Sequence, residues 1–104
     1  MSEAGIENQT KTTKKTKDKV IEPPLYKVIL LNDDYTTFDF VVSILTGFFG
    51  KSVPEAIQIT NDVHRKGSGL CGVFPRDIAE TKVDLVARSS KHAGFPLRCT
   101  MEQA

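Results

Sequence analysis

Three neighbouring polar side chains, Asn32, Asp33 and Asp34, directly follow an apolar run and could accept hydrogen bonds from a cationic ligand. Carboxylate and amide oxygens are strong acceptors, and an exposed turn is a place where they can converge on a ligand. An Asx turn needs one residue of this type, whereas three are present. The spacing by itself leaves a turn and a binding site equally open.

A fourth polar residue, His64, stands near the end of an expected amphipathic helix, on the side of Thr60 and next to Val63. A histidine at a helix C-terminus commonly interacts with the helix dipole, so a structural role and a binding role both stay open. The acids Asp33, Asp34 and Asp62 do not follow a calcium-loop spacing, and we predict no metal site.

Two further patterns suggest enzyme chemistry but fit structural roles better. The stretch Gly67–Gly72 matches G-x-G-x-x-G, yet it ends a helix and leads into a strand, whereas a dinucleotide fingerprint follows a strand and opens a helix. Cys71 and Cys99 belong to apolar strand patterns, where a thiol behaves as a small hydrophobe. With no nucleophile beside a base, we expect no catalytic residue, no cofactor and no enzymatic activity.

The composition narrows the class of protein. The chain has 104 residues with 14 Lys+Arg against 13 Asp+Glu, and a net charge of +1 argues against a nucleic-acid-binding role. No apolar run approaches 18 residues, so no membrane span is expected, and the N-terminus lacks the apolar core of a secretory signal. These features predict a cytoplasmic location.

The elements that must position these residues lie in one domain. Residues 1–24 are polar and lysine-rich, which predicts a disordered N-terminal extension, and residues 25–104 form the folded domain. Thr36 and Ser52 are the expected caps of the first two helices, and the strand at 25–31 is apolar enough to be buried on both faces. The expected elements are a strand at 25–31, helices at 37–49 and 53–66, a strand at 70–74, a helix at 75–93 and a strand at 96–101. This β-α-α-β-α-β order predicts an α+β fold with strands in one layer and helices in the other.

Three short motifs resemble the ClpS adaptor family in their order and spacing. They are Asn-Asp-Asp-Tyr-Thr at 32–36, Cys-Gly-Val-Phe at 71–74 and Ala-Glu-Thr-Lys-Val at 79–83, and the similarity extends from about Pro23 to Glu102. The resemblance implies a three-stranded antiparallel sheet packed against three helices, similar to the C-terminal domain of a ribosomal stalk protein. That fold agrees with the order of elements derived from the residues.

The resemblance also implies a function. ClpS proteins are adaptors that bind N-degron substrates, which carry N-terminal Phe, Leu, Tyr or Trp, and deliver them to the ClpAP or ClpCP AAA+ protease. The expected partners are therefore N-degron peptides and the N-terminal domain of ClpA or ClpC. We expect a monomer that binds neither nucleic acid nor membrane, in a bacterial-type cytoplasm rather than a plastid stroma. The competing class is another interaction module on the same scaffold, which would tolerate loss of Asn32 and His64.

The family pattern assigns roles to individual residues. Asn32, Asp33 and His64 would bind the α-amino group, while Asp34 and Thr36 would brace the loop and contact the peptide backbone. The hydrophobic pocket would consist of Phe38, Val41, Thr60, Val63 and Leu97. The residues implied for docking on the protease are Asp77, Glu80 and Lys82.

The chain departs from the family pattern at two pocket positions. Methionine is common where Phe38 and Thr60 stand. Phenylalanine is stiffer and bulkier than methionine, whereas threonine frees volume nearby. We therefore predict a shifted preference among large N-terminal side chains, with Ile and Val still excluded.

Overall fold

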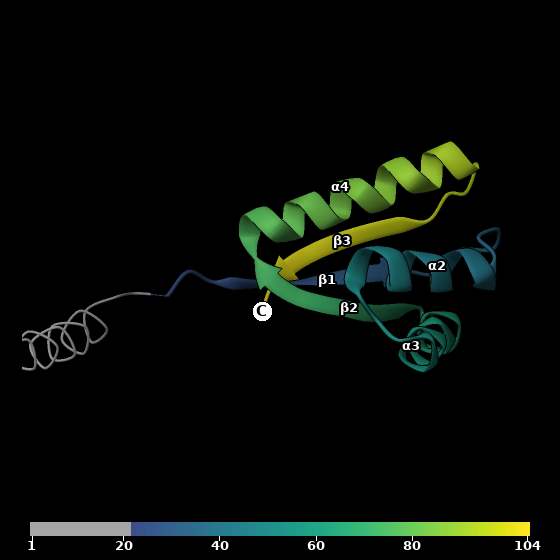
Figure 1. The fold of residues 1–104 in the computed structure, drawn as a ribbon, viewed down its shortest axis with the longest axis horizontal. Coiled ribbons are helices and arrows are strands. Elements are labelled where there is room, and N and C mark those ends of the chain that lie inside the picture. Colours follow the sequence, from purple (N-terminus) through teal and green to yellow (C-terminus); the bar gives the residue numbers. More distant parts are fainter. Residues whose placement is uncertain (1–21) are drawn as a thin grey trace, which may run out of the picture.

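The computed structural model describes residues 22–104, which fold into three helices and one three-stranded sheet (Figure 1). The elements are β1 (Leu25–Leu31), α2 (Phe38–Phe49), α3 (Val53–Lys66), β2 (Ser68–Pro75), α4 (Arg76–Ala93) and β3 (Arg98–Gln103). The predicted α+β class and element order are confirmed. The predicted disordered extension covers residues 1–24, of which residues 1–21 lie outside the described part of the chain.

The sheet has β1 at its centre, with β2 and β3 antiparallel on either side. β2 is longer than the predicted strand at 70–74, and β3 begins and ends two residues later than the predicted strand at 96–101. The ends of both strands pair with β1 beyond the apolar positions. The β1–β2 register shifts between Val28 and Ile29: Val28 opposes Gly72 and Ile29 opposes Leu70. Cys71 is therefore the extra residue of a β-bulge.

The two faces of the sheet differ in burial. Val28 and Leu30 are fully buried beneath the helices, whereas Ile29 and Leu31, which alternate with them, are only half-buried. The prediction that β1 is buried on both faces is therefore wrong. The helices cover one face of this antiparallel sheet, and the alternate side chains of β1 face solvent.

The helix ends follow local sequence signals, with one exception. Ser52 and Glu55 form a reciprocal capping box at the start of α3, and Gly67 ends that helix with a φ of 91°. At the start of α2 the predicted Thr36 cap is wrong. Thr37 is the N-cap, and its side-chain oxygen accepts a hydrogen bond from the Phe40 N–H. Thr36 is instead buried, and its hydroxyl donates to Asp33.

Both cysteines belong to the packed interior, as the strand patterns predict. Cys71 is buried and Cys99 is half-buried, and neither forms a disulfide. Burial raises the pKa of each thiol to about 12. Both thiols are therefore protonated at neutral pH, and neither supplies the thiolate that a cysteine nucleophile requires.

Candidate functional site

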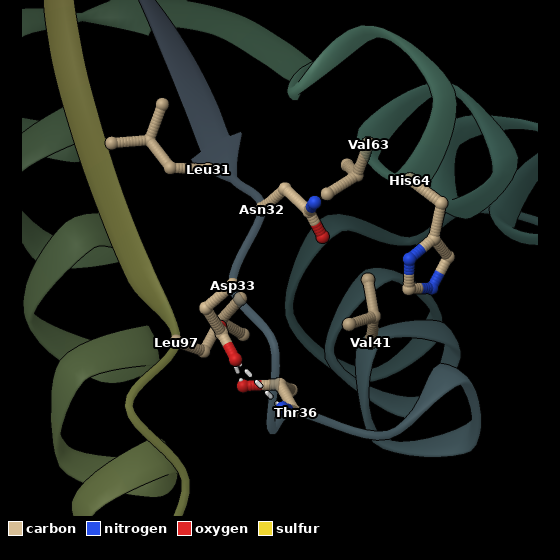
Figure 2. Close-up of a pocket in the computed structure, with 8 residues that line it drawn as sticks. All are labelled: Leu31, Asn32, Asp33, Thr36, Val41, Val63, His64 and Leu97. Atoms are coloured by element: carbon tan, nitrogen blue, oxygen red, sulfur yellow. Dashed lines mark hydrogen bonds between the residues drawn. The ribbon is translucent and has the colours of Figure 1, made fainter.

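A shallow apolar hollow lies where β1 ends, between the start of α2 and the end of α3 (Figure 2). The lining residues are Leu31, Asn32, Asp33, Thr36, Val41, Val63, His64 and Leu97.

The floor of the hollow is apolar and comes from three distant segments of the chain. Val41 belongs to α2, Val63 to α3, and Leu97 immediately precedes β3. Each is at most 5% exposed and belongs to the core cluster. The structure thus brings these three predicted pocket residues together. It adds Leu31, which the sequence analysis placed only in a strand; its position directly before Asn32 was the signal for a site role.

Two polar side chains stand at the rim. Figure 2 shows the Asn32 amide and the His64 imidazole reaching toward the opening from the end of β1 and the end of α3. The Asn32 N–H donates to the Gly67 carbonyl at 3.0 Å. Because Gly67 ends the helix that carries His64, this hydrogen bond holds the two rim residues close together.

Asp33 organises the loop between β1 and α2. Its Oδ1 accepts hydrogen bonds from the N–H groups of Tyr35 and Thr36 at 2.8 and 2.7 Å. Its Oδ2 accepts the Thr36 hydroxyl at 2.7 Å. The resemblance implies a bracing role for Asp34, but here Asp33 makes these contacts. Asp34 is exposed and does not line the hollow.

The same contacts keep the Asp33 carboxyl ionised. Burial raises its pKa, but hydrogen bonds from Thr36 and Tyr35 and the nearby His64 outweigh that effect, and the pKa lies below the ordinary value of 3.8. Hydrogen bonds to the charged form of a carboxyl stabilise that form. The rim therefore carries a negative charge at neutral pH.

The lowered pKa predicts how Asp33 contributes to stability. A carboxyl with a depressed pKa stabilises the fold above its unfolded pKa of about 3.9, and this contribution disappears as the pH falls through the folded value. We expect Asp33→Asn to reduce the free energy of unfolding by a constant amount near neutral pH, with the difference shrinking below about pH 4. Urea denaturation of both proteins at several pH values measures this difference in the free energy of unfolding.

Asp34→Asn is the matched control because it removes the same charge from the same exposed loop. Its effect on unfolding should be smaller than that of Asp33→Asn at neutral pH. Equal effects of the two variants across the pH range would contradict the assignment of loop bracing to Asp33.

The two remaining predicted pocket residues lie beside the hollow rather than in its lining. Phe38 begins α2, and its ring stacks on His64 with centroids 5.7 Å apart and planes inclined by 9°. Thr60 is fully buried in α3, and its hydroxyl donates to the Ala56 carbonyl at 2.7 Å. Phe38 therefore contacts His64 at the rim, and Thr60 bonds within α3, the helix that carries His64.

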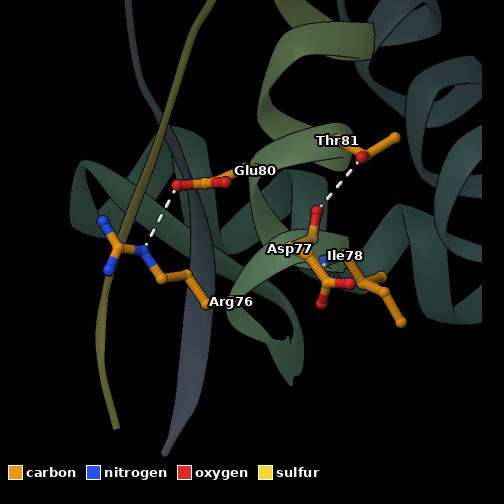
Figure 3. Close-up of polar contacts among 5 residues, drawn as sticks. All are labelled: Arg76, Asp77, Ile78, Glu80 and Thr81. Atoms are coloured by element: carbon orange, nitrogen blue, oxygen red, sulfur yellow. Dashed lines mark hydrogen bonds and ion pairs between the residues drawn. The ribbon is translucent and has the colours of Figure 1, made fainter.

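The residues implied for protease docking lie on α4, which begins where β2 ends. Figure 3 shows two of them, Asp77 and Glu80. Asp77 is exposed, and exposed Glu80 accepts a hydrogen bond from Arg76 at 3.3 Å. Lys82 follows Glu80 by two residues, so the two side chains do not share a helix face. The structure therefore does not gather the three residues into one cluster.

Lys82 faces α2 instead of open solvent. Its Nζ donates to the Phe48 carbonyl at 2.6 Å and lies 5.8 and 5.7 Å from the ring centroids of Phe49 and Phe74. An ammonium at the C-terminal end of a helix satisfies its free carbonyls and favours the negative end of its dipole. Lys82 thus links α4 to the end of α2.

Two other kinds of site were sought in the described part of the chain. Between residues 22 and 104, no three His, Cys, Asp or Glu side chains gather in a way that could hold a metal ion. No helix in the same range is long and apolar enough to cross a membrane.

The fold and the site define a small α+β binding domain, in which an apolar hollow is bordered by hydrogen-bond acceptors. The family model described as "ATP-dependent Clp protease adaptor protein ClpS" matches residues 21–100. The chain belongs to the ClpS family. It is accordingly an adaptor of an ATP-dependent Clp protease and not a catalytic enzyme.

Relatives support this assignment along most of the chain. The chain is 48% identical over 99 residues to the ClpS adapter of Cupriavidus metallidurans, covering 94% of this chain and 92% of the relative. It is 51% identical over 94 residues to the ClpS adapter of Ralstonia nicotianae, covering 89% and 87%.

A solved structure shares the fold. Agrobacterium tumefaciens ClpS2 bound to L-phenylalaninamide is 44% identical, with a TM-score of 0.77, over 80% of this chain and 100% of that chain. The antiparallel three-stranded sheet with three helices is therefore the family architecture.

Proposed function

We propose that this adaptor recognises N-degron substrates by binding their α-amino group together with a large hydrophobic N-terminal side chain. The observation that carries the proposal is that Asn32, Asp33 and His64 border a shallow hollow whose other lining residues are largely apolar. The ligand of the ClpS2 relative, L-phenylalaninamide, has this combination of an amine and a large apolar side chain, and supports the proposal.

The rim has the chemistry that an ammonium group requires. An α-amino group has a pKa of about 7.7–8.0 and is largely protonated at neutral pH, with three N–H donors. The Asn32 amide oxygen, the Asp33 carboxylate and a neutral His64 ring nitrogen are the matching acceptors. Asp33 is ionised at that pH, which adds charge attraction. The proposal extends to Asp34 and Thr36, on the same loop, as contacts for the peptide backbone.

The apolar hollow supplies the second half of the affinity. Burying a Leu or Phe side chain against Val41, Val63 and Leu97 is worth about 1.5–3 kcal/mol. Each hydrogen bond to a charged group adds about 1.5–3 kcal/mol, and ordering the peptide subtracts several. Micromolar binding corresponds to about 8 kcal/mol, which only the two halves together can approach.

A panel of peptides that differ only in the first residue tests the proposal. We expect peptides starting with Phe, Leu, Tyr or Trp to bind, and peptides starting with Ser or Lys not to bind, in fluorescence anisotropy. Because Phe38 and Thr60 replace common methionines, the ranking among the large residues should shift, while Val stays excluded. Equal Kd values for Val-initiated and Phe-initiated peptides would refute the predicted selectivity.

Delivery requires a second surface, which we place on α4. Asp77 and Glu80 are exposed near its first turn and could contact the N-terminal domain of ClpA or ClpC, with Lys82 next to them in the chain.

Bacterial relatives favour the expected cytoplasmic location over a plastid stroma. We expect the adaptor to act as a monomer.

The N-terminal extension is proposed as the segment that the unfoldase engages during delivery. Deleting residues 2–20 should leave the Kd for a Phe-initiated peptide unchanged, because the hollow is built from residues 31–97. Degradation of a Phe-initiated reporter by ClpAP or ClpCP should fall to the rate seen without adaptor. Undiminished degradation would show that the extension has no part in delivery.

A further inference from the structure

The His64 ring has no polar contact that fixes its orientation. His64 is exposed, and within residues 22–104 neither ring nitrogen forms a hydrogen bond or an ion pair. The terminal torsion of a histidine side chain is broad and roughly two-fold. Without another contact, the ring would therefore present its nitrogens toward the hollow for only part of the time.

Among residues 22–104, the one aromatic ring that stacks on His64 is that of Phe38. The two planes are inclined by only 9° with centroids 5.7 Å apart, which is an offset-stacked arrangement. Phe38 is itself half-buried at the first position of α2. The Thr37 cap directly before it holds the start of the helix. The stack thus joins the His64 ring on α3 to the capped start of α2.

We propose that Phe38 is a positioning residue, which holds the His64 imidazole in the plane where a ring nitrogen faces the α-amino group. The inference rests on the proposed function, because it assigns Phe38 a part in amine recognition in addition to its place beside the hollow. Leu or Met at position 38 would keep apolar bulk but would not provide a flat ring against which the imidazole lies parallel. An offset stack is worth about a two- to tenfold change in an equilibrium constant.

The first test needs no peptide. In the free protein, NMR should show the His64 ring protons shifted upfield by the Phe38 ring current, with His92→Asn used to assign the two histidines. Phe38→Leu should abolish the shift and Phe38→Tyr should retain it. An identical His64 spectrum in wild type and Phe38→Leu would overturn the inference, whatever the protein binds.

The second test separates positioning from a change in the shape of the hollow. The Kd of a Phe-initiated peptide is measured for wild type, Phe38→Leu, His64→Ala and the double variant. If Phe38→Leu changes only the shape of the hollow around the peptide's N-terminal side chain, its effect on Kd is the same with or without His64. A positioning effect is present only with His64, so Phe38→Leu should weaken binding about two- to tenfold more in the His64 background.

Phe38→Tyr should restore the wild-type Kd in that cycle, because it keeps the flat ring. An equal fold-change from Phe38→Leu in the two backgrounds would overturn the inference and leave the proposed function intact. Failure of the wild-type protein to bind the peptide would refute the proposed function instead, and the NMR comparison would still decide whether Phe38 orients His64.

Discussion

Acetylation of the α-amino group of a Phe-initiated peptide is expected to weaken its binding by at least about a hundredfold. The acetyl group removes the positive charge and leaves one of the three donors that we propose to face Asn32, Asp33 and His64. Each hydrogen bond to a charged group is worth about 1.5–3 kcal/mol, and 1.4 kcal/mol is a factor of ten in Kd. Fluorescence anisotropy with the two peptides measures the ratio directly.

Asn32→Ala should reproduce part of this loss, on the order of tenfold or more for the free-amine peptide, because it removes one acceptor. Gln58→Ala is the matched control. Gln58 lies on α3 and carries the same amide group, but its side chain is exposed and does not line the hollow. It should leave the Kd unchanged. Equal binding of the acetylated and free peptides would refute amine recognition and favour a different interaction module on this scaffold, which would tolerate loss of Asn32.

Replacing a fully buried core leucine should produce the largest loss of stability. Leu45 on α2 is 0% exposed and packs in the cluster that joins the helices to the sheet. Leu45→Ala removes buried carbons and leaves a cavity, at a cost of about 2–5 kcal/mol. Domains of this size are stable by about 5–15 kcal/mol, and each kcal/mol shifts Tm by about 4–8 °C. A Tm lower by at least about 10 °C is therefore expected in thermal unfolding.

Leu85→Ala provides the control for that measurement. Leu85 is also a helical leucine, but it is 36% exposed on α4. Alanine is a good helix former, so this change should stay within about 0.5 kcal/mol of wild type. A loss as large as that of Leu45→Ala would mean that the core is not centred between α2 and the sheet.

Asp33 connects stability with the proposed recognition. Its carboxylate already holds two N–H groups and one hydroxyl of the loop in the unliganded protein. A loop that is ordered before binding reduces the conformational entropy that a ligand must overcome. The same negative charge lies next to the place proposed for the ammonium group. Asp33 therefore contributes both to the geometry of the rim and to its charge.

Local signals in the chain predicted the elements well, because they act over a few residues. The Ser52 and Glu55 capping box, and the glycines that end the helices, need only their own turn to form. The Thr36 cap failed for a reason that lies outside that turn. Two threonines stand at suitable positions, and Asp33 takes the hydroxyl of the first, so Thr37 caps the helix.

By itself, the sequence determined the α+β order, the interior character of Cys71 and the short polar motif that begins at Asn32. The tertiary structure alone decided that only one face of β1 is buried, because helix packing selects the face. It also placed Phe38 on His64 and turned Lys82 away from Glu80 toward Phe48. Each of these contacts joins residues about 26 to 34 positions apart, as the separation of 34 between Lys82 and Phe48 illustrates. Hydrophobic periodicity and capping rules extend over a turn or two and carry no information on such pairs.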